Sequence, residues 1–299
     1  MIAVSIASWV FHDAGAAFLT RARVPLDFAT AVLLASLVII WCAEQAYPID
    51  PEWNYRLLAS PISRATEGWN RLARDLAYLF IVTFVGSLLI GWVARQLETR
   101  ASSLSALHVW PTEAPFVVRV VLAFFAVELL SYWFHRLAHR VKVFWRFHQT
   151  HHVVTELTSL KALRTHPIDN LFFYLARSMP LLLIGADPAE LVAVVYFGAT
   201  LSLLSHANVD VSDRVLGWVV NFPRYHAVHH SSQIAETNSN FGCHTIVWDR
   251  VFGTFRPQAA GAIELGVHPR GRRSLWHELV MPPKSETFLE GGSRRHSGP

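Results

Sequence analysis

The chain has 299 residues, of which 52% are hydrophobic and only 16% charged, against roughly 25% charged residues in a soluble domain, so it is typical of an integral membrane protein. Its formal net charge is +4, but the arginines are dispersed and no stacking-aromatic RNA motif occurs, which argues against nucleic-acid binding. Two isolated cysteines exclude a disulfide framework and a cysteine-rich zinc site.

Apolar segments in chain order predict the membrane-crossing helices. Residues 1–20 are apolar but contain His12 and Asp13, so we expect a helix at the membrane surface there. Residues 28–43 and 76–94 carry no charge and approach the roughly 20 residues that a helix needs to cross a bilayer. The sequence therefore predicts two crossing helices in its first third.

Two further apolar stretches carry irregularities. Residues 116–134 contain Glu128, and an acidic group inside a span is either functional or paired, for example with an arginine of a neighbouring helix. Residues 171–205 are broken at Pro180 and again at residues 185–188, so each half is short for a full crossing. These stretches predict one span and one hairpin or re-entrant pair.

Histidines carry the strongest chemical signal, because ten of the sixteen lie between residues 135 and 230. Eight of them form three clusters: His135-x-x-x-His139, His148-x-x-His151-His152 and His226-x-x-His229-His230. Residues three or four apart share one face of a helix, so each cluster can present its imidazoles together. Imidazole is a frequent ligand of iron, zinc and copper, and eight imidazoles exceed the four ligands of a structural zinc. The clusters therefore indicate two metal ions.

Topology limits how the clusters meet, because residues 171–205 separate the first two clusters from the third. If all three share one site, this segment must return to its starting side of the membrane. His206 ends the hairpin on that side, and we expect it to be a further ligand. For His166 three roles stay open: a metal ligand, a hydrogen-bond donor to a ligand, or a helix cap. His244 is ambiguous but more similar to the histidines that have no metal-spaced partners, for which no metal-binding role is expected.

Lysine and arginine residues predict the orientation. Four arginines occupy loop 44–75, six basic residues lie within residues 136–164, and ten follow His206, whereas loop 95–115 holds two. This distribution favours a histidine site and a C-terminus on the cytoplasmic side. Arg21 and Arg23 then fall outside, which is a mild conflict.

Distinctive runs accompany the clusters: Tyr132-Trp133-Phe134-His135-Arg136, Phe147-His148-Gln149-Thr150-His151-His152, and Asn240-Phe241-Gly242 followed by Trp248-Asp249-Arg250-Val251-Phe252-Gly253-Thr254. Together they resemble the fatty acid hydroxylase superfamily, which includes sterol desaturases, fatty acyl hydroxylases and alkylglycerol monooxygenases. The resemblance covers roughly residues 115–256 and is specific to the superfamily but not to a substrate.

The resemblance implies a non-haem di-iron enzyme of the membrane that uses O2 to oxidise an unactivated C–H bond. The family's ligand boxes carry over onto nine histidines: His135, His139, His148, His151, His152, His226, His229 and His230, with His206 as the further ligand. Some relatives have another histidine pair before the last box. Here the position four after His206 is Asp210, which is either a carboxylate ligand or a turn residue. Because no haem or flavin domain is recognisable, electrons are expected from an external reductase.

We therefore expect an all-α integral membrane bundle of about four spanning or re-entrant helices with a cytosolic, histidine-rich helical cap. Its predicted parts are an N-terminal membrane region (1–114), a catalytic domain (115–256) and a polar tail (257–299). The expected function is hydroxylation or desaturation of a sterol, fatty acyl or ether lipid. A non-catalytic metal-binding membrane protein and a zinc-dependent lipid hydrolase are the alternatives.

Several other positions have weaker interpretations. Four tryptophans are of a kind expected at the membrane interface, and a packing or anchoring role is favoured for them over substrate contact: Trp133, Trp145, Trp218 and Trp248. Asn238 and Asn240 either donate to ligating histidines or form a turn. Asp249 and Arg250 are expected to form a local ion pair.

Overall fold

The computed structural model describes residues 26–101, 109–257, 263–267 and 275–280. Its helices are α3 (Leu26–Ala46), α4 (Ile62–Ala101), α5 (Phe116–Ala138), α6 (Lys142–His152), the 3-10 helix η1 (Ser159–Leu163), α7 (Pro167–Arg177), α8 (Met179–Leu183), α9 (Pro188–Ser205), α10 (Pro223–His229), α11 (Ile234–Thr237), α12 (Val247–Val251) and α13 (Leu275–Val280). Strand pairing in these ranges is limited to two isolated bridges. The all-α prediction is confirmed, while the predicted surface helix at 1–20 lies outside the described residues.

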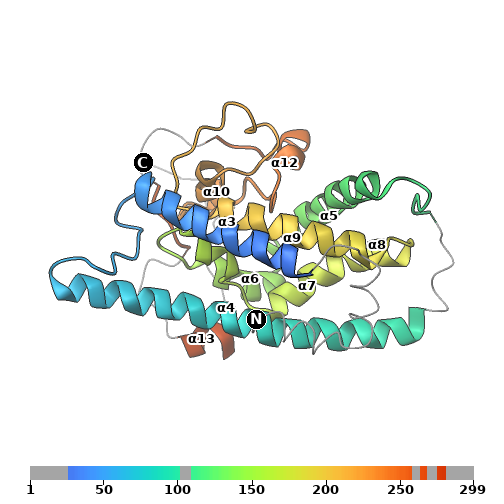
Figure 1. Ribbon diagram of the computed structural model, residues 1–299, viewed down its shortest axis with the longest axis horizontal. Helices are drawn as coiled ribbons and strands as arrows, with labels where there is room; N and C mark the ends of the chain where they lie inside the picture. Colours follow the sequence, from blue (N-terminus) through green and yellow to red (C-terminus); the bar gives the residue numbers. More distant parts are fainter. Residues whose placement is uncertain (1–25, 102–108, 258–262, 268–274, 281–299) are drawn as a thin grey trace, which may run out of the picture.

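Three of the helices are long and apolar enough to cross a membrane. They include Ile62–Val93 within α4, all of α5 and all of α9, and α3 adds a shorter apolar stretch, Ala31–Ala46. In Figure 1, α3, α4 and α9 run lengthwise across the molecule. This arrangement confirms a membrane helical bundle.

The first long loop is shorter than predicted, because α4 begins at Ile62 rather than near residue 76. Arg71 and Asp75 therefore lie on a helix instead of in the loop 44–75. The helix extends beyond its apolar part because these polar side chains have buried partners: Asp75 accepts from Lys161 Nζ at 2.6 Å, and Arg71 donates to the Trp53 carbonyl at 3.2 Å.

The predicted return of the chain after the second histidine cluster is present as α7, α8 and α9. Gly185, with φ of +98°, follows α8 in a left-handed conformation that favours glycine. Asp187 then caps α9: its carboxylate accepts from the Ala189 N–H at 2.9 Å, and Glu190 accepts from the Asp187 N–H at 3.3 Å. Pro188 occupies the first helical position, where a missing N–H has no cost. The break is thus a capped turn that sends the chain back.

The core of the bundle lies between α5 and the α7–α9 hairpin. α5 packs against α7 and α9, α3 packs against α9, and α4 packs against α7. Phe124 and Val127 of α5 meet Leu191 and Val194 of α9 in one buried apolar cluster. Packing α9 between α3 and α5 brings the C-terminal ends of α5 and α9, and the histidines there, to the same end of the bundle.

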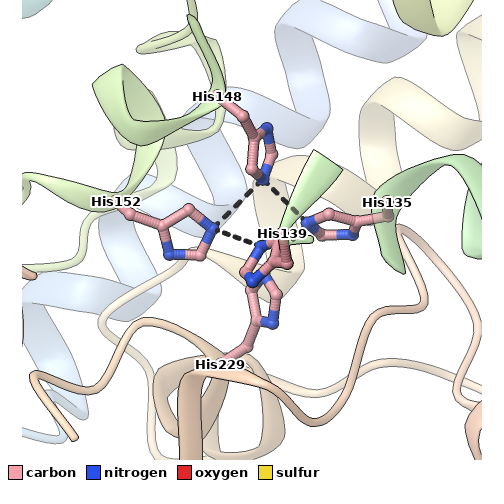
Figure 2. A group of neighbouring side chains, drawn as sticks. All are labelled: His135, His139, His148, His152 and His229. Atoms are coloured by element: carbon pink, nitrogen blue, oxygen red, sulfur yellow. Dashed lines mark hydrogen bonds between the residues drawn. The ribbon is translucent and has the colours of Figure 1, made fainter. Parts of the chain in front are cut away.

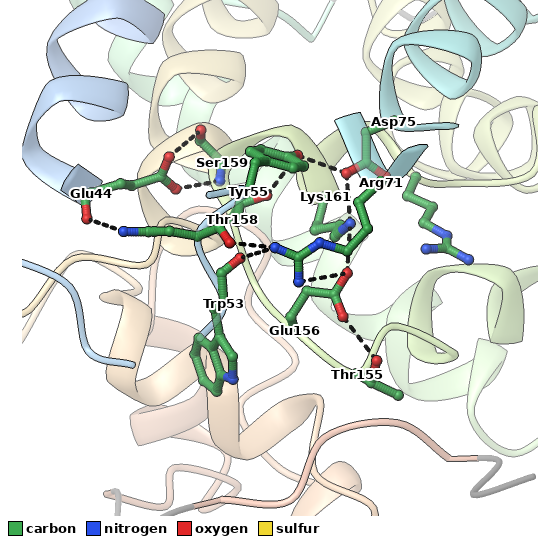
Figure 3. Close-up of polar contacts among 12 residues, drawn as sticks. Glu44, Trp53, Tyr55, Arg71, Asp75, Thr155, Glu156, Thr158, Ser159 and Lys161 are labelled. Carbon is green, nitrogen blue, oxygen red and sulfur yellow. Dashed lines mark hydrogen bonds and ion pairs between the residues drawn. The ribbon is translucent and has the colours of Figure 1, made fainter. Parts of the chain in front are cut away.

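A buried charged cluster joins the N-terminal helices to the segment after α6 (Figure 3). We use "charged cluster" for Tyr55, Arg71, Asp75, Glu156 and Lys161. Lys161 Nζ lies 2.6 Å from Asp75 and 3.3 Å from Glu156, and Tyr55 donates to Asp75 at 2.6 Å. Arg71 approaches Glu156 at 3.9 Å. Opposite charges therefore compensate one another across three segments of the chain.

Glu128 in α5 is fully buried and has a partner other than the predicted arginine. Its carboxylate accepts from His244 Nδ1 at 2.6 Å and from the N–H groups of His244 and Thr245 at 3.0 and 2.9 Å. Burial of a carboxylate is tolerated when hydrogen bonds satisfy it. Glu128 thus holds the segment after the third cluster against the middle of α5.

Candidate metal centre

Four helices deliver nine buried histidines to the end of the bundle. His135 lies in the last turn of α5 and His139 is its C-cap residue. The second cluster forms the last turns of α6, the third lies on α10 and its C-cap, and His206 is the C-cap residue of α9. Helical spacing of three and four residues therefore turns each cluster inward, as the sequence predicts.

The nine rings divide into two groups. The first group contains His135, His139, His148, His152 and His229 (Figure 2), and the second contains His151, His206, His226 and His230. Within each group one ring nitrogen per residue lies within 4.8 Å of all the others. Each adjacent pair is split between the groups, because neighbouring residues on a helix point about 100° apart.

In the first group the Nε2 atoms converge closely. His148 Nε2 lies 2.9 Å from that of His135 and 3.1 Å from that of His152, and His229 Nε2 lies 3.0 Å from that of His135. The second group converges similarly, with Nε2 distances of 2.9–3.1 Å. The histidines of both groups turn the same nitrogen inward.

The outward Nδ1 atoms fix the tautomer of several rings. His135 donates to the Phe241 carbonyl at 2.6 Å, and His229 donates to the Ser239 carbonyl at 2.8 Å. A carbonyl only accepts, so Nδ1 carries the proton and Nε2 of a neutral ring presents a lone pair. These two Nε2 lone pairs face each other at 3.0 Å, where they cannot form a hydrogen bond.

The second group repeats this arrangement. His151 donates from Nδ1 to the Arg164 carbonyl at 3.3 Å, and His206 donates to the Ser202 carbonyl at 2.9 Å, while their Nε2 atoms lie 3.1 Å apart. Burial lowers the pKa of His151 and of His206 well below 6.5, so protonation of these rings is disfavoured. The donor set fits a metal cation, which binds the neutral imidazole lone pair.

One carboxylate supports the first group from outside. His148 Nδ1 lies 3.0 Å from Asp169 Oδ2, and both side chains are buried. Burial lowers the pKa of His148 to about 3 and raises that of Asp169 to about 8. A cation on Nε2 would favour the ionised carboxylate, since carboxylates behind ligating histidines strengthen metal binding.

Two residues left open by the sequence lie outside both groups. His166 caps α7, accepting from the Ile168 N–H at 3.1 Å, and its Nε2 contacts the Leu279 carbonyl at 2.8 Å. Of its three interpretations, the helix cap is confirmed. Asp210 is half exposed and pairs with Arg224 at 2.8 Å, and it belongs to neither histidine group.

The contacts also bear on the tryptophan and asparagine residues and on the predicted ion pair. Trp145 is buried against the rings of His139 and His152 rather than lying at an interface. Asn238 is the C-cap residue of α11.

Asn240 instead adopts φ of +51° and donates to the Tyr225 and Arg256 carbonyls, so the turn interpretation holds for it. The predicted Asp249–Arg250 ion pair is wrong. Asp249 accepts from the Phe241 and Gly242 N–H groups at 2.7 Å, and Arg250 donates to the Gly217 carbonyl.

Some residues that hold the histidines in place come from distant parts of the sequence and were not predicted. Arg164 orients His151 through its carbonyl, and its guanidinium pairs with Glu278 of α13 at 2.9 Å. Glu278 also accepts from Tyr78 of α4. Neither Asp169 nor Glu278 has metal-ligand spacing, so no local pattern marks them.

Proteins of known function resemble the chain across this site. A family model described as fatty acid hydroxylase matches residues 120–254. The ornithine lipid hydroxylase OlsE of Rhizobium tropici is 31% identical over 272 residues, which make up 90% of this chain and 79% of that protein.

Two further relatives match a smaller share of the chain. An alkylglycerol monooxygenase of Danio rerio is 31% identical over 221 residues, 70% of this chain and 48% of that protein. A Delta(7)-sterol-C5(6)-desaturase of Nicotiana tabacum is 29% identical over 149 residues, 47% of this chain and 51% of that protein. The chain thus spans about half the length of these two relatives, and no solved structure matches it. The chain belongs to the fatty acid hydroxylase family, which confirms the family and the oxidoreductase class predicted from its histidine clusters.

Proposed function

We propose that the protein is a membrane-bound, non-haem di-iron oxygenase that hydroxylates or desaturates a C–H bond of a lipid. The observation that carries the proposal is the division of nine buried histidines into two adjacent groups at the end of apolar helices. Two neighbouring metal positions suit O2-dependent oxidation, whereas a hydrolytic zinc needs three protein ligands and an open position. A zinc hydrolase would leave most of these histidines without a role.

Each group would hold one iron ion. The first would use His135, His139, His148, His152 and His229, and the second would use His151, His206, His226 and His230. When bound, the iron pair supplies the redox chemistry that reduces O2 and oxidises the substrate carbon. Five and four imidazoles respectively suit iron, for which imidazole is a preferred ligand.

The chain's own residues orient the ligands and keep water out. Backbone carbonyls and Asp169 hold the Nδ1 protons of His135, His148 and His229, so each Nε2 stays directed inward. Phe241 and Trp145 pack against the His139 ring, with ring centroids at 5.2 and 5.1 Å. A dry, rigid enclosure favours reaction at one bound carbon over side reactions.

The substrate is proposed to be a lipid that reaches the site from the bilayer. His135 belongs to α5 and His206 directly follows α9, so two helices that are apolar enough to cross a membrane end at the histidines. The relatives act on an ornithine lipid, an alkylglycerol and a sterol, by their names, which supports a lipid substrate here. The basic segments around the site favour the cytoplasmic side. Electrons are proposed to come from a separate electron-transfer protein.

A mass-resolved lipid comparison tests this function. Membranes from cells that express the wild-type chain are compared with membranes that hold His151→Ala/His152→Ala, which removes one ligand from each group. Asp210→Asn serves as the matched control, because Asp210 lies outside both groups. We expect a lipid heavier by one oxygen, or lighter by two hydrogens, with wild type and control only. Identical lipid profiles in all three, with iron-loaded protein and a reductase present, would contradict the proposal.

A further inference from the structure

An exposed apolar segment precedes the third histidine cluster. Val215 and Trp218 are 87% and 71% exposed, and Leu216 between them is 54% exposed. A large apolar surface that faces water is costly, and contiguous patches of this kind mark contact with a membrane or a protein. The segment belongs to the part of the chain predicted as a cytosolic cap, so its exposure needs a separate explanation.

The segment is continuous with apolar residues beside α5. Arg250 donates to the Gly217 carbonyl at 2.7 Å, and its guanidinium lies 4.3 Å from the Trp218 ring centroid. The next two residues, Val251 and Phe252, are exposed, and the Phe252 ring lies 5.0 Å from that of Trp133 on α5. We call this surface the apolar belt: Trp133, Val215, Leu216, Trp218, Val251 and Phe252.

Contacts to Glu128 determine the position of the apolar belt along the axis of α5. Val220 forms a bridge with Thr245, and the Thr245 hydroxyl donates to the Val219 carbonyl. The Thr245 N–H donates to Glu128 at 2.9 Å. Glu128 lies ten residues before the end of α5 at Ala138, which corresponds to about 15 Å along the helix. The segment is thus joined to the interior of an apolar helix rather than to its end.

The backbone of the segment is suited to an apolar environment. The N–H of Gly217 donates to the Asp213 carbonyl at 2.7 Å, and those of Val219 and Val220 donate to the Leu216 carbonyl at 2.9 and 2.8 Å. Irregular backbone enters a bilayer only where its polar groups are satisfied within the protein. These bonds remove much of the cost of placing the segment among lipids.

We propose that the apolar belt inserts into the bilayer leaflet nearest the histidine groups. A bilayer is the favoured occupant because the belt continues the exposed apolar face of α5 that carries Trp133, including Val118 and Leu122. Arginines also lie over its tryptophans, with Arg136 5.1 Å from the Trp133 ring centroid. Tryptophan and arginine together are typical of the membrane–water boundary.

Insertion would attach the second histidine group directly to the membrane. The belt segment leads into Asn221, whose amide contacts His226 Nδ1 at 3.2 Å and donates to the Gly242 carbonyl at 2.7 Å. α10 and its ligands then begin two residues later, at Pro223. The inference concerns where the protein meets lipid, and it stands whether or not the enzyme uses iron.

Site-directed fluorescence in lipid vesicles tests the belt. In full-length protein with Cys42→Ala and Cys243→Ala, an environment-sensitive probe is attached at Leu216→Cys, and at Trp218→Cys as a second position in case the first misfolds. Val121→Cys, on the exposed face of α5, reports lipid contact. Glu52→Cys, whose side chain is 73% exposed in the loop before α4, reports water.

We expect the belt probes to shift to the blue and to be quenched by nitroxide-labelled phosphatidylcholine several-fold more than the Glu52 probe, as the Val121 probe is. Quenching by aqueous iodide at the level of the Glu52 probe would overturn the proposal. Protection from both quenchers would also overturn it, because a protein partner or a second copy would then cover the belt.

Discussion

Two of the buried polar centres in the described part of the chain, the charged cluster and the histidine groups, differ in what satisfies them. In the charged cluster, Lys161 and Arg71 face Asp75 and Glu156, so each charge has an opposite partner within the chain. In the histidine groups, nine imidazole rings converge. The Nε2 lone pairs of His135 and His229, and those of His151 and His206, face each other at about 3 Å. The first centre is complete in itself and is structural. The second presents converging lone pairs that bound cations would satisfy, and this difference supports our proposal that it is the functional centre.

Removal of one ligand from each histidine group in turn has the largest expected effect. His152→Ala affects the first group and His151→Ala the second, although the two residues are neighbours. We expect each variant to lose one of two metal ions and to lower product formation by at least about 100-fold, since residues behind the ligands already matter 10–100-fold. Metal analysis and product assay check this. Loss of the same ion in both variants would contradict the division into two groups.

The second largest effect is expected from acidification, which protonates the histidine groups. Burial lowers the pKa of eight of the nine grouped histidines, those outside the spans, below 6.5: His139, His148, His151, His152, His206, His226, His229 and His230. Below pH 6.5 the unfolded chain binds more protons than the folded one, so the free energy of unfolding falls as the pH is lowered. We expect metal release and destabilisation to begin between pH 6.5 and 5. Metal retention and unchanged thermal unfolding at pH 5 would argue against neutral ligands.

Breaking the charged cluster is expected to affect stability but not metal content. Lys161→Met leaves Asp75 buried without its cation and leaves Glu156 with Arg71 alone, which costs about 3–5 kcal/mol. Thermal unfolding in detergent measures the loss, and Lys142→Met, at an exposed position, is the control. Metal bound per folded chain stays at the wild-type value. A folded but metal-poor Lys161 variant would show that the cluster belongs to the functional centre.

A smaller effect is expected from Asp169→Asn, which weakens the acceptor behind His148. The affinity of the first group for metal falls by about 10–100-fold, because the carboxylate no longer orients the ring or raises its basicity. Competition with a chelator measures the affinity of each group. Equal weakening of both groups would indicate a general folding defect instead.

The smallest effect is expected from substitution of Asp210. This carboxylate lies four residues after His206 but belongs to neither histidine group. Asp210→Asn removes a surface pair with Arg224, which is worth at most about 1 kcal/mol. Metal content, product formation and thermal unfolding stay close to wild type. A loss of metal from this variant would mean that Asp210 reaches the second group in the working enzyme.

Features of this structure that depend on local helical spacing could be predicted from the sequence, whereas features that depend on tertiary packing could not. Helical spacing is a local property, so the inward direction of each histidine cluster and the hairpin before His206 follow from sequence. Helical spacing also points neighbouring His151 and His152 in different directions, but which other histidines join each of them depends on how α5, α6, α9 and α10 pack together.

Long-range pairing explains what sequence reasoning missed. Asp169, Glu278 and Lys161 each find partners through tertiary contacts, and an isolated charged residue gives no local sign of such a partner. Glu128 illustrates the same limit. Its position in a span predicts a partner, but the identity of that partner, His244, depends on a segment 116 residues away.

The number of metal ions per chain tests the central claim most directly. Purified wild-type protein, reconstituted anaerobically with ferrous iron and freed of excess metal, is analysed for iron and for protein. The division of nine buried histidines into two groups predicts two irons per chain. One metal ion per chain, or none after reconstitution of folded protein, would contradict a di-iron centre.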